Sequence, residues 1–278
     1  MPINAGPRSL RVPEGISRLL RDLIHERTGI FFEDVRMDAL LEKLEPLALD
    51  MKCQSFLEYY YALKDNAHSE WNHAWDALSV QETYFYRETS QVNALTQAIL
   101  PEWFKKGTRP FRIWSAACAT GEEPFSIAIA IVEAGLAAYP IEITASDASP
   151  TALAKASAAV YREKSFRSSF PPALRLKYFT AVEGGWKLSP IITSRVVFKR
   201  ANLFEPGEIA PLARAHVVFC RNVFIYFSPH AIRQTVATIA TRMPSGGHLF
   251  VGASESLLRT TTDFELTEIA GALAYVRI

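Results

Sequence analysis

The chain has 278 residues, of which 49% are hydrophobic and 21% charged, and its formal net charge is +1. This length and composition predict a globular protein with one large α/β core and a smaller domain, and the near-neutral charge argues against a nucleic-acid partner. We find no apolar run long enough to span a membrane and no signal-peptide pattern, so we expect a cytoplasmic protein without membrane insertion. The cysteines Cys53, Cys118 and Cys220 lie far apart and predict neither a disulfide nor a zinc site.

The first part of the chain has the pattern of a small helical bundle. Apolar residues recur at helical spacing in residues 14–29, 35–49 and 55–63, and Gly29 supplies a stop for the first helix. We therefore predict an all-α N-terminal domain over residues 1–78, followed by a linker or lid helix over residues 79–108.

The pattern changes to alternating strands and helices over residues 109–278, which we expect to form the catalytic domain. The strand-like runs are 112–115, 141–146, 217–220 and 249–251, and helices follow from Glu123, Pro150 and Pro229. This alternation predicts an α/β fold with a parallel, doubly wound, Rossmann-like sheet.

An insertion interrupts this alternation at residues 162–200. Its two strand-like pieces, 178–182 and 196–199, predict a small antiparallel β-subdomain with a hairpin turn at Gly184 and Gly185. Two last strands are expected on either side of Gly271.

A loop of small residues, 115–121, joins the strand at 112–115 to its helix. Such a loop leaves backbone N–H groups open to a ligand, but Glu122 and Glu123 stand where a phosphate-binding loop has Lys. The acids favour a cationic ligand, and S-adenosylmethionine combines an adenosine with an ammonium and a sulfonium. The alternative is that both glutamates are first-turn acids that stabilise the helix dipole by about 0.3–1 kcal/mol.

Polar residues follow several of the predicted strands, at the edge where open α/β sheets bind ligands. Asp147 is placed to accept hydrogen bonds from a ribose diol; its alternative role as a helix cap suits Ser149 better. Asn202 and Leu203 can face an adenine, or form an ordinary strand-end turn. The pair Arg221-Asn222 exposes two polar groups where a structural role seldom requires them. Tyr226 lies four residues beyond Asn222, so in a helical turn the two side chains share one face; alternatively, Tyr226 is a packed aromatic residue.

The segment Gln81-Glu82-Thr83-Tyr84-Phe85-Tyr86-Arg87-Glu88 alternates polar and aromatic residues at the join of the two domains. This pattern suits a lid over a bound adenosine, because aromatic rings attract a nearby sulfonium by about 0.5–2 kcal/mol. The start of an interdomain helix capped by Thr83 is an alternative compatible with the lid.

A set of motifs occurs in one order along the chain. They are Thr83-Tyr84-Phe85-Tyr86-Arg87-Glu88, Trp114-Ser115-Ala116 with Thr120-Gly121-Glu122-Glu123-Pro124, Ala145-Ser146-Asp147, Asn202-Leu203, Phe219-Cys220-Arg221-Asn222 through Ile225-Tyr226-Phe227, and Gly252-Ala253-Ser254-Glu255-Ser256. In this order they resemble the chemotaxis receptor methyltransferase (CheR-type) family, whose members esterify glutamates on bacterial chemoreceptors. The resemblance covers most of the chain.

The resemblance implies a Rossmann-like S-adenosylmethionine-dependent methyltransferase domain with an inserted small antiparallel β-subdomain, preceded by an all-α domain. It implies a monomer that acts on the cytoplasmic domain of methyl-accepting chemoreceptors, releases S-adenosylhomocysteine and needs no metal. The implied catalytic residues are Tyr226, which helps to place the substrate carboxylate, and Arg87. The implied cofactor contacts are Gln81, Thr83, Arg87, Glu122, Asp147, Asn202, Leu203, Arg221 and Asn222.

Two positions depart from the family pattern. The family usually has Asn where this chain has Gln81, and Asp-x-Asp where it has Asp147-Ala148-Ser149. They motivate a second hypothesis, a sensor or adaptor that binds S-adenosylmethionine but has lost transferase activity. A methyltransferase acting on small molecules or nucleic acids is a weaker alternative, because the chain has no Asn-Pro-Pro-aromatic motif and no basic stripe.

Overall fold

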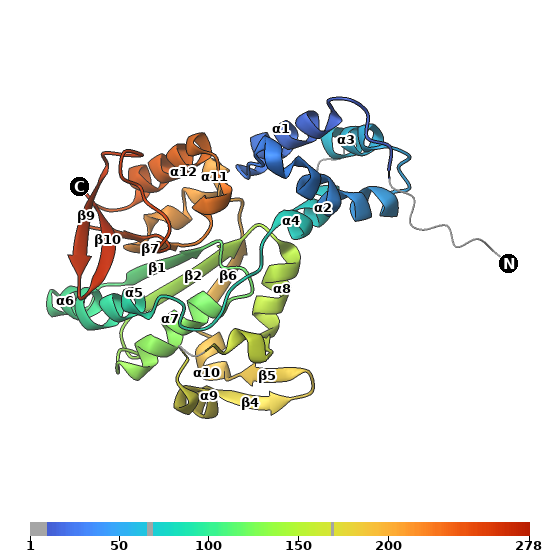
Figure 1. The fold of residues 1–278 in the computed structure, drawn as a ribbon. Coiled ribbons are helices and arrows are strands. Elements are labelled where there is room, and N and C mark those ends of the chain that lie inside the picture. Colours follow the sequence, from blue (N-terminus) through green and yellow to red (C-terminus); the bar gives the residue numbers. More distant parts are fainter. Residues whose placement is uncertain (1–9, 66–68, 168–169) are drawn as a thin grey trace. The chain divides into compact units, whose positions relative to one another are not determined.

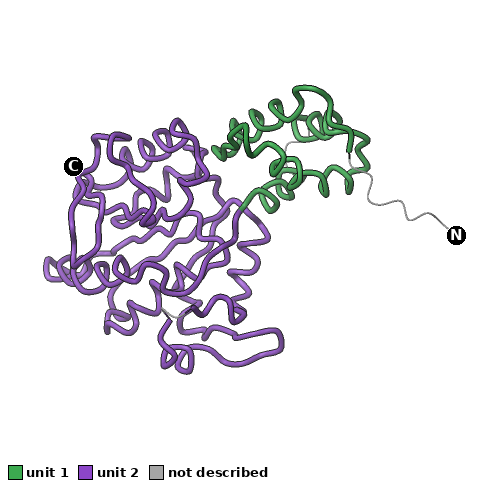
Figure 2. Tube along the Cα trace, viewed as in Figure 1, with its two compact units in different colours: residues 1–79 green, residues 80–278 purple. Residues whose placement is uncertain are grey.

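The computed structural model describes residues 10–65, 69–167 and 170–278, which divide into two compact units, residues 1–79 and 80–278 (Figure 2). In the described part of the chain, no helix combines the length and apolar character needed to cross a bilayer.

The first unit is helical, as its apolar periodicity predicts. Its elements are α1 (Ile16–Thr28), a 3-10 turn (Asp34–Arg36), α2 (Met37–Asp50), α3 (Phe56–Asp65) and α4 (Ser69–Leu78). Gly29 ends α1 in the left-handed conformation and donates its N–H to the His25 carbonyl, which is the expected helix stop. The sequence pattern gave no separate expectation for α4, which buries Trp71 and Trp75.

The second unit is built on a seven-stranded sheet with the order β6-β2-β1-β7-β8-β10-β9 (Figure 1). Strands β6, β2, β1, β7 and β8 are parallel to one another, and the hairpin of β9 and β10 extends the sheet in antiparallel fashion. The bounds are β1 (Phe111–Ala116), β2 (Ile141–Asp147), β6 (Val196–Arg200), β7 (Val217–Cys220), β8 (His248–Phe250), β9 (Phe264–Ile269) and β10 (Ala272–Arg277). The predicted Rossmann-like α/β fold is confirmed.

Helices cover both faces of this sheet, because side chains alternate along each strand. In β1, Phe111 and Ile113 pack toward α7, whereas Trp114 and Ala116 pack toward α12. The helices are α5 (Thr89–Ala94), a π-helical turn (Leu95–Ile99), α6 (Leu100–Lys105), α7 (Glu122–Glu133), α8 (Pro150–Ala158), α9 (Pro172–Tyr178), α10 (Pro190–Thr193), α11 (Pro206–Ile209) and α12 (Pro229–Arg242). Short 3-10 turns lie at Glu163–Ser165, Leu212–Arg214 and Phe224–Tyr226.

A second, three-stranded antiparallel sheet forms the inserted β-subdomain. It consists of β3 (Val160–Tyr161), β5 (Gly185–Leu188) and β4 (Phe179–Val182), in that order. Gly184 and Gly185 both have positive φ at the hairpin, and a Cβ on Gly185 would lie 2.3 Å from the Tyr161 carbonyl oxygen.

One strand assignment made from the sequence is wrong. Residues 196–199 were expected in the antiparallel insertion, but β6 pairs in parallel with β2 and forms an edge of the large sheet. An edge strand buries only part of its side chains, so its pattern resembles that of a half-exposed antiparallel strand. The small sheet instead takes its third strand from Val160–Tyr161, which precedes the predicted range of the insertion.

Candidate functional site

The loops that follow the parallel strands meet at one edge of the large sheet. Strands β1, β2, β6, β7 and β8 run in the same direction, so the residues after their carboxyl ends lie along this edge (Figure 1). The predicted site residues that it brings there are Glu122, Asp147, Asn202, Leu203, Arg221 and Asn222.

The loop between β1 and α7 has a strained backbone. Ala117, Ala119 and Gly121 have φ values of 52°, 47° and 92°, so left-handed residues alternate with ordinary ones. Strain of this kind gathers at ligand sites, where the surrounding structure holds the backbone in place. The Cys118 N–H donates to the Ser146 carbonyl at 2.9 Å, which ties the loop to the end of β2.

Gly121 is required for both space and backbone conformation. A Cβ at this position would lie 2.9 Å from the Ala156 Cβ. We expect Gly121→Ala to lower the melting temperature clearly more than Gly135→Ala, because Gly135 has a similar positive φ of 73° but open space around its Cα. Thermal unfolding followed by circular dichroism measures both variants. Equal losses would show that only the backbone conformation matters.

Asp147 ends β2 with its carboxylate fixed by two backbone amides. Its Oδ2 accepts the Ala119 N–H at 2.8 Å and its Oδ1 accepts the Ser149 N–H at 2.9 Å. The residue is 8% exposed. Ser149, not Asp147, caps α8 by accepting the Ala152 N–H at 3.0 Å, as the sequence predicted.

Glu122 is buried at the start of α7 and borders a cavity. Thr120 Oγ1 donates to its Oε2 at 2.6 Å and Ser165 Oγ donates to its Oε1 at 2.8 Å. Burial raises the pKa of the Glu122 carboxyl, and these two hydrogen bonds oppose that shift. The cavity has a volume of about 530 Å³, and Gln81 and Thr83 line it together with Glu122. Three predicted cofactor residues therefore share one cavity.

The two residues that depart from the family pattern contact each other. Gln81 Nε2 donates to Ser149 Oγ at 3.5 Å, and Lys155 Nζ donates to Gln81 Oε1 at 3.1 Å. The longer amide side chain thus faces the shorter hydroxyl side chain that stands where the family has Asp.

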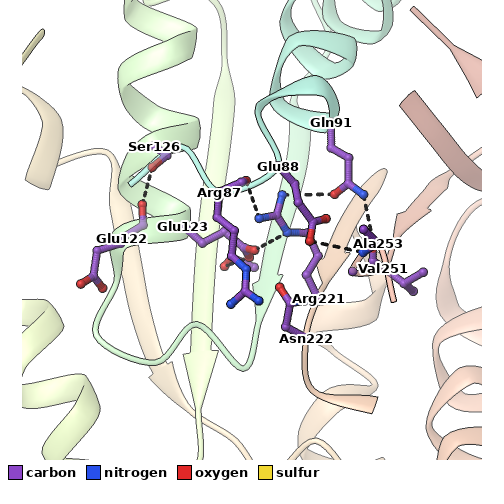
Figure 3. Close-up of polar contacts among 12 residues, drawn as sticks. Arg87, Glu88, Gln91, Glu122, Glu123, Ser126, Arg221, Asn222, Val251 and Ala253 are labelled. Carbon is purple, nitrogen blue, oxygen red and sulfur yellow. Dashed lines mark hydrogen bonds and ion pairs between the residues drawn. The ribbon is translucent and has the colours of Figure 1, made fainter. Parts of the chain in front are cut away.

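Arg221 lies in a buried polar network rather than at an open surface. Its Nε lies 2.9 Å from Glu123 Oε2, its Nη1 donates to Gln91 Oε1 at 3.1 Å, and its Nη2 donates to the Arg87 carbonyl at 2.6 Å (Figure 3). The Arg221 side chain is 2% exposed. The expectation that a structural role seldom requires an arginine here is therefore wrong, because a buried guanidinium needs such a set of acceptors.

Glu123 and Gln91 complete this network. Burial raises the pKa of the Glu123 carboxyl, whereas the Arg221 charge and a 2.6 Å hydrogen bond from Ser115 Oγ oppose the shift. Gln91 Nε2 also donates to the Val251 carbonyl at 2.8 Å (Figure 3). Sequence reasoning gave Gln91 no role, since its partner Arg221 lies 130 positions further along the chain.

The segment 81–88 is anchored by its aromatic residues. Phe85 is fully buried and packs against Phe166, Phe170 and Phe179 with ring centroids 5.2–5.4 Å apart. The Tyr86 N–H donates to Ser126 Oγ at 2.9 Å. Residues 81–84 are not helical and α5 begins only at Thr89, so the prediction of a lid helix is wrong for this segment. The buried Phe85 and Tyr86 belong to the core, whereas Gln81 and Thr83 line the cavity beside Glu122, so a lid role of this segment stays a prediction.

Arg87 and Tyr84 are half-buried members of this segment. Arg87 Nη1 donates to the Glu82 carbonyl at 3.1 Å, and its guanidinium carbon lies 5.6 Å from the centre of the Tyr84 ring. The two arginines thus differ in solvent exposure: Arg221 is buried, and Arg87 is half-buried.

Asn222 and Tyr226 do not share a helical turn. Asn222 has a φ of 58°, and only Phe224–Tyr226 forms a short 3-10 turn. After β6, Asn202 Oδ1 accepts the Phe204 N–H at 3.0 Å, while Leu203 is buried in the core on the α12 side of the sheet. The strand-end turn considered for Asn202 is present.

A second cavity lies at the opposite edge of the sheet. It has a volume of about 830 Å³ and is lined by Trp103, Phe111, His216 and His248 among others, and none of the predicted site residues borders it. Burial, with the nearby charges of Arg112 and Arg109, lowers the pKa of His216 to about 4. We place the functional site at the carboxyl edge instead, since the polar strand-end residues gather there. Among the described residues, no group of three or more His, Cys, Asp and Glu could hold a metal ion.

The sheet order, the small-residue loop after β1 and the acid at the end of β2 together define a nucleotide-binding α/β protein. Comparison with known proteins gives the particular family. Residues 81–272 match the family described as CheR methyltransferase, SAM binding domain, and residues 18–79 match CheR methyltransferase, all-alpha domain. The chain belongs to the CheR methyltransferase family, and its cofactor is S-adenosylmethionine.

Several relatives align over most of this chain. Chemotaxis protein methyltransferase 2 of Vibrio cholerae is 34% identical over 92% of this chain and 91% of its own length. Chemotaxis protein methyltransferase 1 of Pseudomonas aeruginosa is 36% identical over 72% of this chain and 75% of its own. The probable biofilm formation methyltransferase WspC of Pseudomonas putida is 30% identical over 91% of this chain and 60% of its own.

The similarity to one solved methyltransferase is weaker. The glycopeptide N-methyltransferase MtfA complexed with S-adenosyl-L-methionine aligns over 70% of this chain and 69% of its own, with 16% identity and a TM-score of 0.36. These values are too low to support a statement about activity.

Proposed function

We propose that this protein transfers the methyl group of S-adenosylmethionine to glutamate side chains of chemoreceptors and forms methyl esters. The observation that carries the proposal is the alignment with a chemotaxis protein methyltransferase over 92% of the chain. The site supports it with acidic and amide side chains suited to a cationic adenosine cofactor. The proposed setting is a cytoplasmic monomer acting on the cytoplasmic part of a membrane receptor.

The residues at the carboxyl edge fit the cofactor chemically. Asp147 presents a preorganised carboxylate for a ribose diol, and the Asn202 amide with the Leu203 backbone suits an adenine. Gln81, Thr83 and Glu122 border the cavity that we assign to the amino-acid part of the cofactor. Gly121 leaves the loop free of a side chain next to this cavity.

The role that we give Arg221 differs from a direct cofactor contact. Its guanidinium is occupied by Glu123, Gln91 and the Arg87 carbonyl. We therefore propose that Arg221 positions the neighbouring Asn222 and the segment around Arg87. Asn222 and Arg87 then face the cofactor.

The reaction needs alignment more than acid–base chemistry. An exposed glutamate has a pKa near 4.3, so at neutral pH it is already the ionised nucleophile. The cofactor supplies an electrophilic methyl group on a sulfonium that is its own leaving group. We propose that Arg87 and Tyr226 hold the attacking carboxylate in line with this methyl group; orientation of this kind lowers barriers by up to roughly 7–11 kcal/mol.

The chemistry of the product distinguishes this proposal from other methyl transfers. We expect tritium from labelled S-adenosylmethionine to appear on receptor fragments and to leave them as volatile methanol in mild alkali, because a carboxylate ester is base-labile. Methylated lysine and arginine are stable to this treatment. Alkali-stable label would contradict the glutamate assignment, and no transfer at all would favour the sensor hypothesis.

The contact between Gln81 and Ser149 bears on that second hypothesis. Gln81 and Ser149, the two departures from the family pattern, contact each other. The longer side chain at one position therefore accompanies the shorter one at the other, and a polar contact between the two positions is kept. We therefore retain the transferase as the proposed function.

A further inference from the structure

One carboxylate joins the loop after β7 to the loop after β8. Glu255 Oε2 accepts the Asn222 N–H at 2.8 Å and the Gly252 N–H at 2.6 Å, and Glu255 Oε1 accepts the Ile225 N–H at 3.3 Å. Hydrogen bonds to an ionised acceptor are stronger than those between neutral groups. A single side chain therefore fixes three backbone positions that belong to two neighbouring strand ends.

This carboxylate holds a left-handed backbone position. Asn222 has a φ of 58°, a conformation that Asn adopts more readily than most other non-glycine residues and that local hydrogen bonds stabilise. The Glu255 carboxylate binds the N–H of this same residue. It also binds the N–H of Ile225, the middle residue of the 3-10 turn that ends at Tyr226.

Gly252 allows the two loops to approach closely. A Cβ at this position would lie 2.4 Å from Asn222 Nδ2 and 2.9 Å from Glu255 Oε2. The Asn222 side chain thus lies against bare backbone, in the space that any other residue would fill. A side chain at 252 would have to displace Asn222.

The loop after β8 is held from its other side by α5 and the residues before it. The Ala253 N–H donates to Glu88 Oε1 at 3.2 Å, and the Val251 carbonyl accepts from Gln91 Nε2 at 2.8 Å (Figure 3). The anchor that Glu255 provides is therefore itself fixed to the segment that carries Arg87.

We infer that Glu255 is a positioning residue for methyl transfer, which holds Asn222 and the turn of Tyr226 in their working orientation through backbone hydrogen bonds. The inference rests on the proposed function of these two residues. Glu255→Gln keeps the size of the side chain but replaces one acceptor oxygen with an NH₂ group, which cannot accept a backbone N–H. The loops then lose part of their common anchor.

Kinetics on the full chain with receptor fragments test this role. We expect Glu255→Gln to lower kcat on the order of 100-fold, as a small misplacement of reacting groups does. Affinity for S-adenosylhomocysteine should fall less than kcat, because the proposed contacts from Glu122 and Asp147 come from other loops and only the proposed contact of Asn222 is disturbed. Glu255→Asp, which keeps the charge, should recover part of kcat. Glu265→Gln, the same change at an exposed position of β9, should behave as wild type.

A spectroscopic readout separates this inference from the proposed function. With ¹⁵N-glycine labelling, the 13 glycines give a simple amide spectrum. We expect the Gly252 amide far downfield in the wild type and upfield in Glu255→Gln. Gly252→Ala tests the same junction if Glu255→Gln does not fold.

Three outcomes would decide between the explanations. An unchanged kcat in Glu255→Gln would overturn the inference. A parallel loss of kcat, ligand affinity and melting temperature, without recovery in Glu255→Asp, would reduce Glu255 to a stabilising residue and also overturn it. If the wild type itself transfers no methyl group while the Gly252 amide behaves as expected, the proposed function fails. The hydrogen bonds of Glu255 to the two loops are then present but have no role in methyl transfer.

Discussion

Replacing Asp147 with alanine should weaken the binding of S-adenosylhomocysteine at least tenfold. A hydrogen bond to a charged acceptor contributes about 1.5–3 kcal/mol, and a ribose diol offers two donors to this carboxylate. The substitution also leaves the Ala119 and Ser149 N–H groups without the Asp147 acceptor, so the loop after β1 keeps the Cys118–Ser146 hydrogen bond but loses a second tie to β2. Isothermal titration calorimetry measures the change.

Two further variants test whether the loss of affinity is specific to the Asp147 carboxylate. Asp147→Asn keeps one acceptor oxygen and should lose less affinity than the alanine variant. Asp50→Ala removes an exposed carboxylate at the end of α2, in the other unit, and should leave affinity unchanged. Wild-type affinity in Asp147→Ala would contradict the placement of the ribose at the end of β2.

Replacing Arg221 with leucine should destabilise the protein by about 3–5 kcal/mol, because it leaves the buried Glu123 carboxylate without its cation. The reduced stability appears in urea unfolding of the full chain. The double variant Arg221→Leu with Glu123→Leu removes both charges and should recover much of this loss. A double variant as unstable as the single one would show that the hydrogen bonds to Gln91 and Arg87, not the ion pair, dominate.

The same pair predicts a pH dependence. Burial raises the folded-state pKa of Glu123 above its unfolded value, so this group favours folding at low pH and that contribution is lost as the pH rises through the folded pKa. Without Arg221 the pKa rises further. The stability difference between wild type and Arg221→Leu should therefore be smaller at pH 5 than at pH 8, and a difference that grows in acid would contradict this account of the pair.

The features that the sequence predicted well are local ones. Alternating apolar runs located the strands of the parallel sheet, and the direction of parallel strands then placed Asp147 and Asn202 at a common edge. The cap at Ser149 follows from its position just before Pro150 at the start of α8. These inferences depend only on neighbouring residues and on the geometry of one fold class.

The features that the sequence did not predict depend on contacts between distant residues. Arg221 is paired within the chain because Gln91, 130 positions earlier, reaches it across the sheet edge. Phe85 is a core residue because Phe166 and Phe179, from the β-subdomain region, surround it. Local periodicity contains no information about such partners, so the burial of Phe85 was not predicted and the buried Arg221 was interpreted as an exposed residue.

The most direct test of the proposed activity is peptide mapping by mass spectrometry after incubation of receptor fragments with the protein and S-adenosylmethionine. We expect the mass of one methyl group to appear on glutamate side chains, to disappear in mild alkali, and to be absent from fragments in which those glutamates are replaced by glutamine. The added mass on lysine, arginine or a backbone amine, or unmodified receptor in the presence of bound cofactor, would contradict the assignment of this protein as a glutamate methyltransferase.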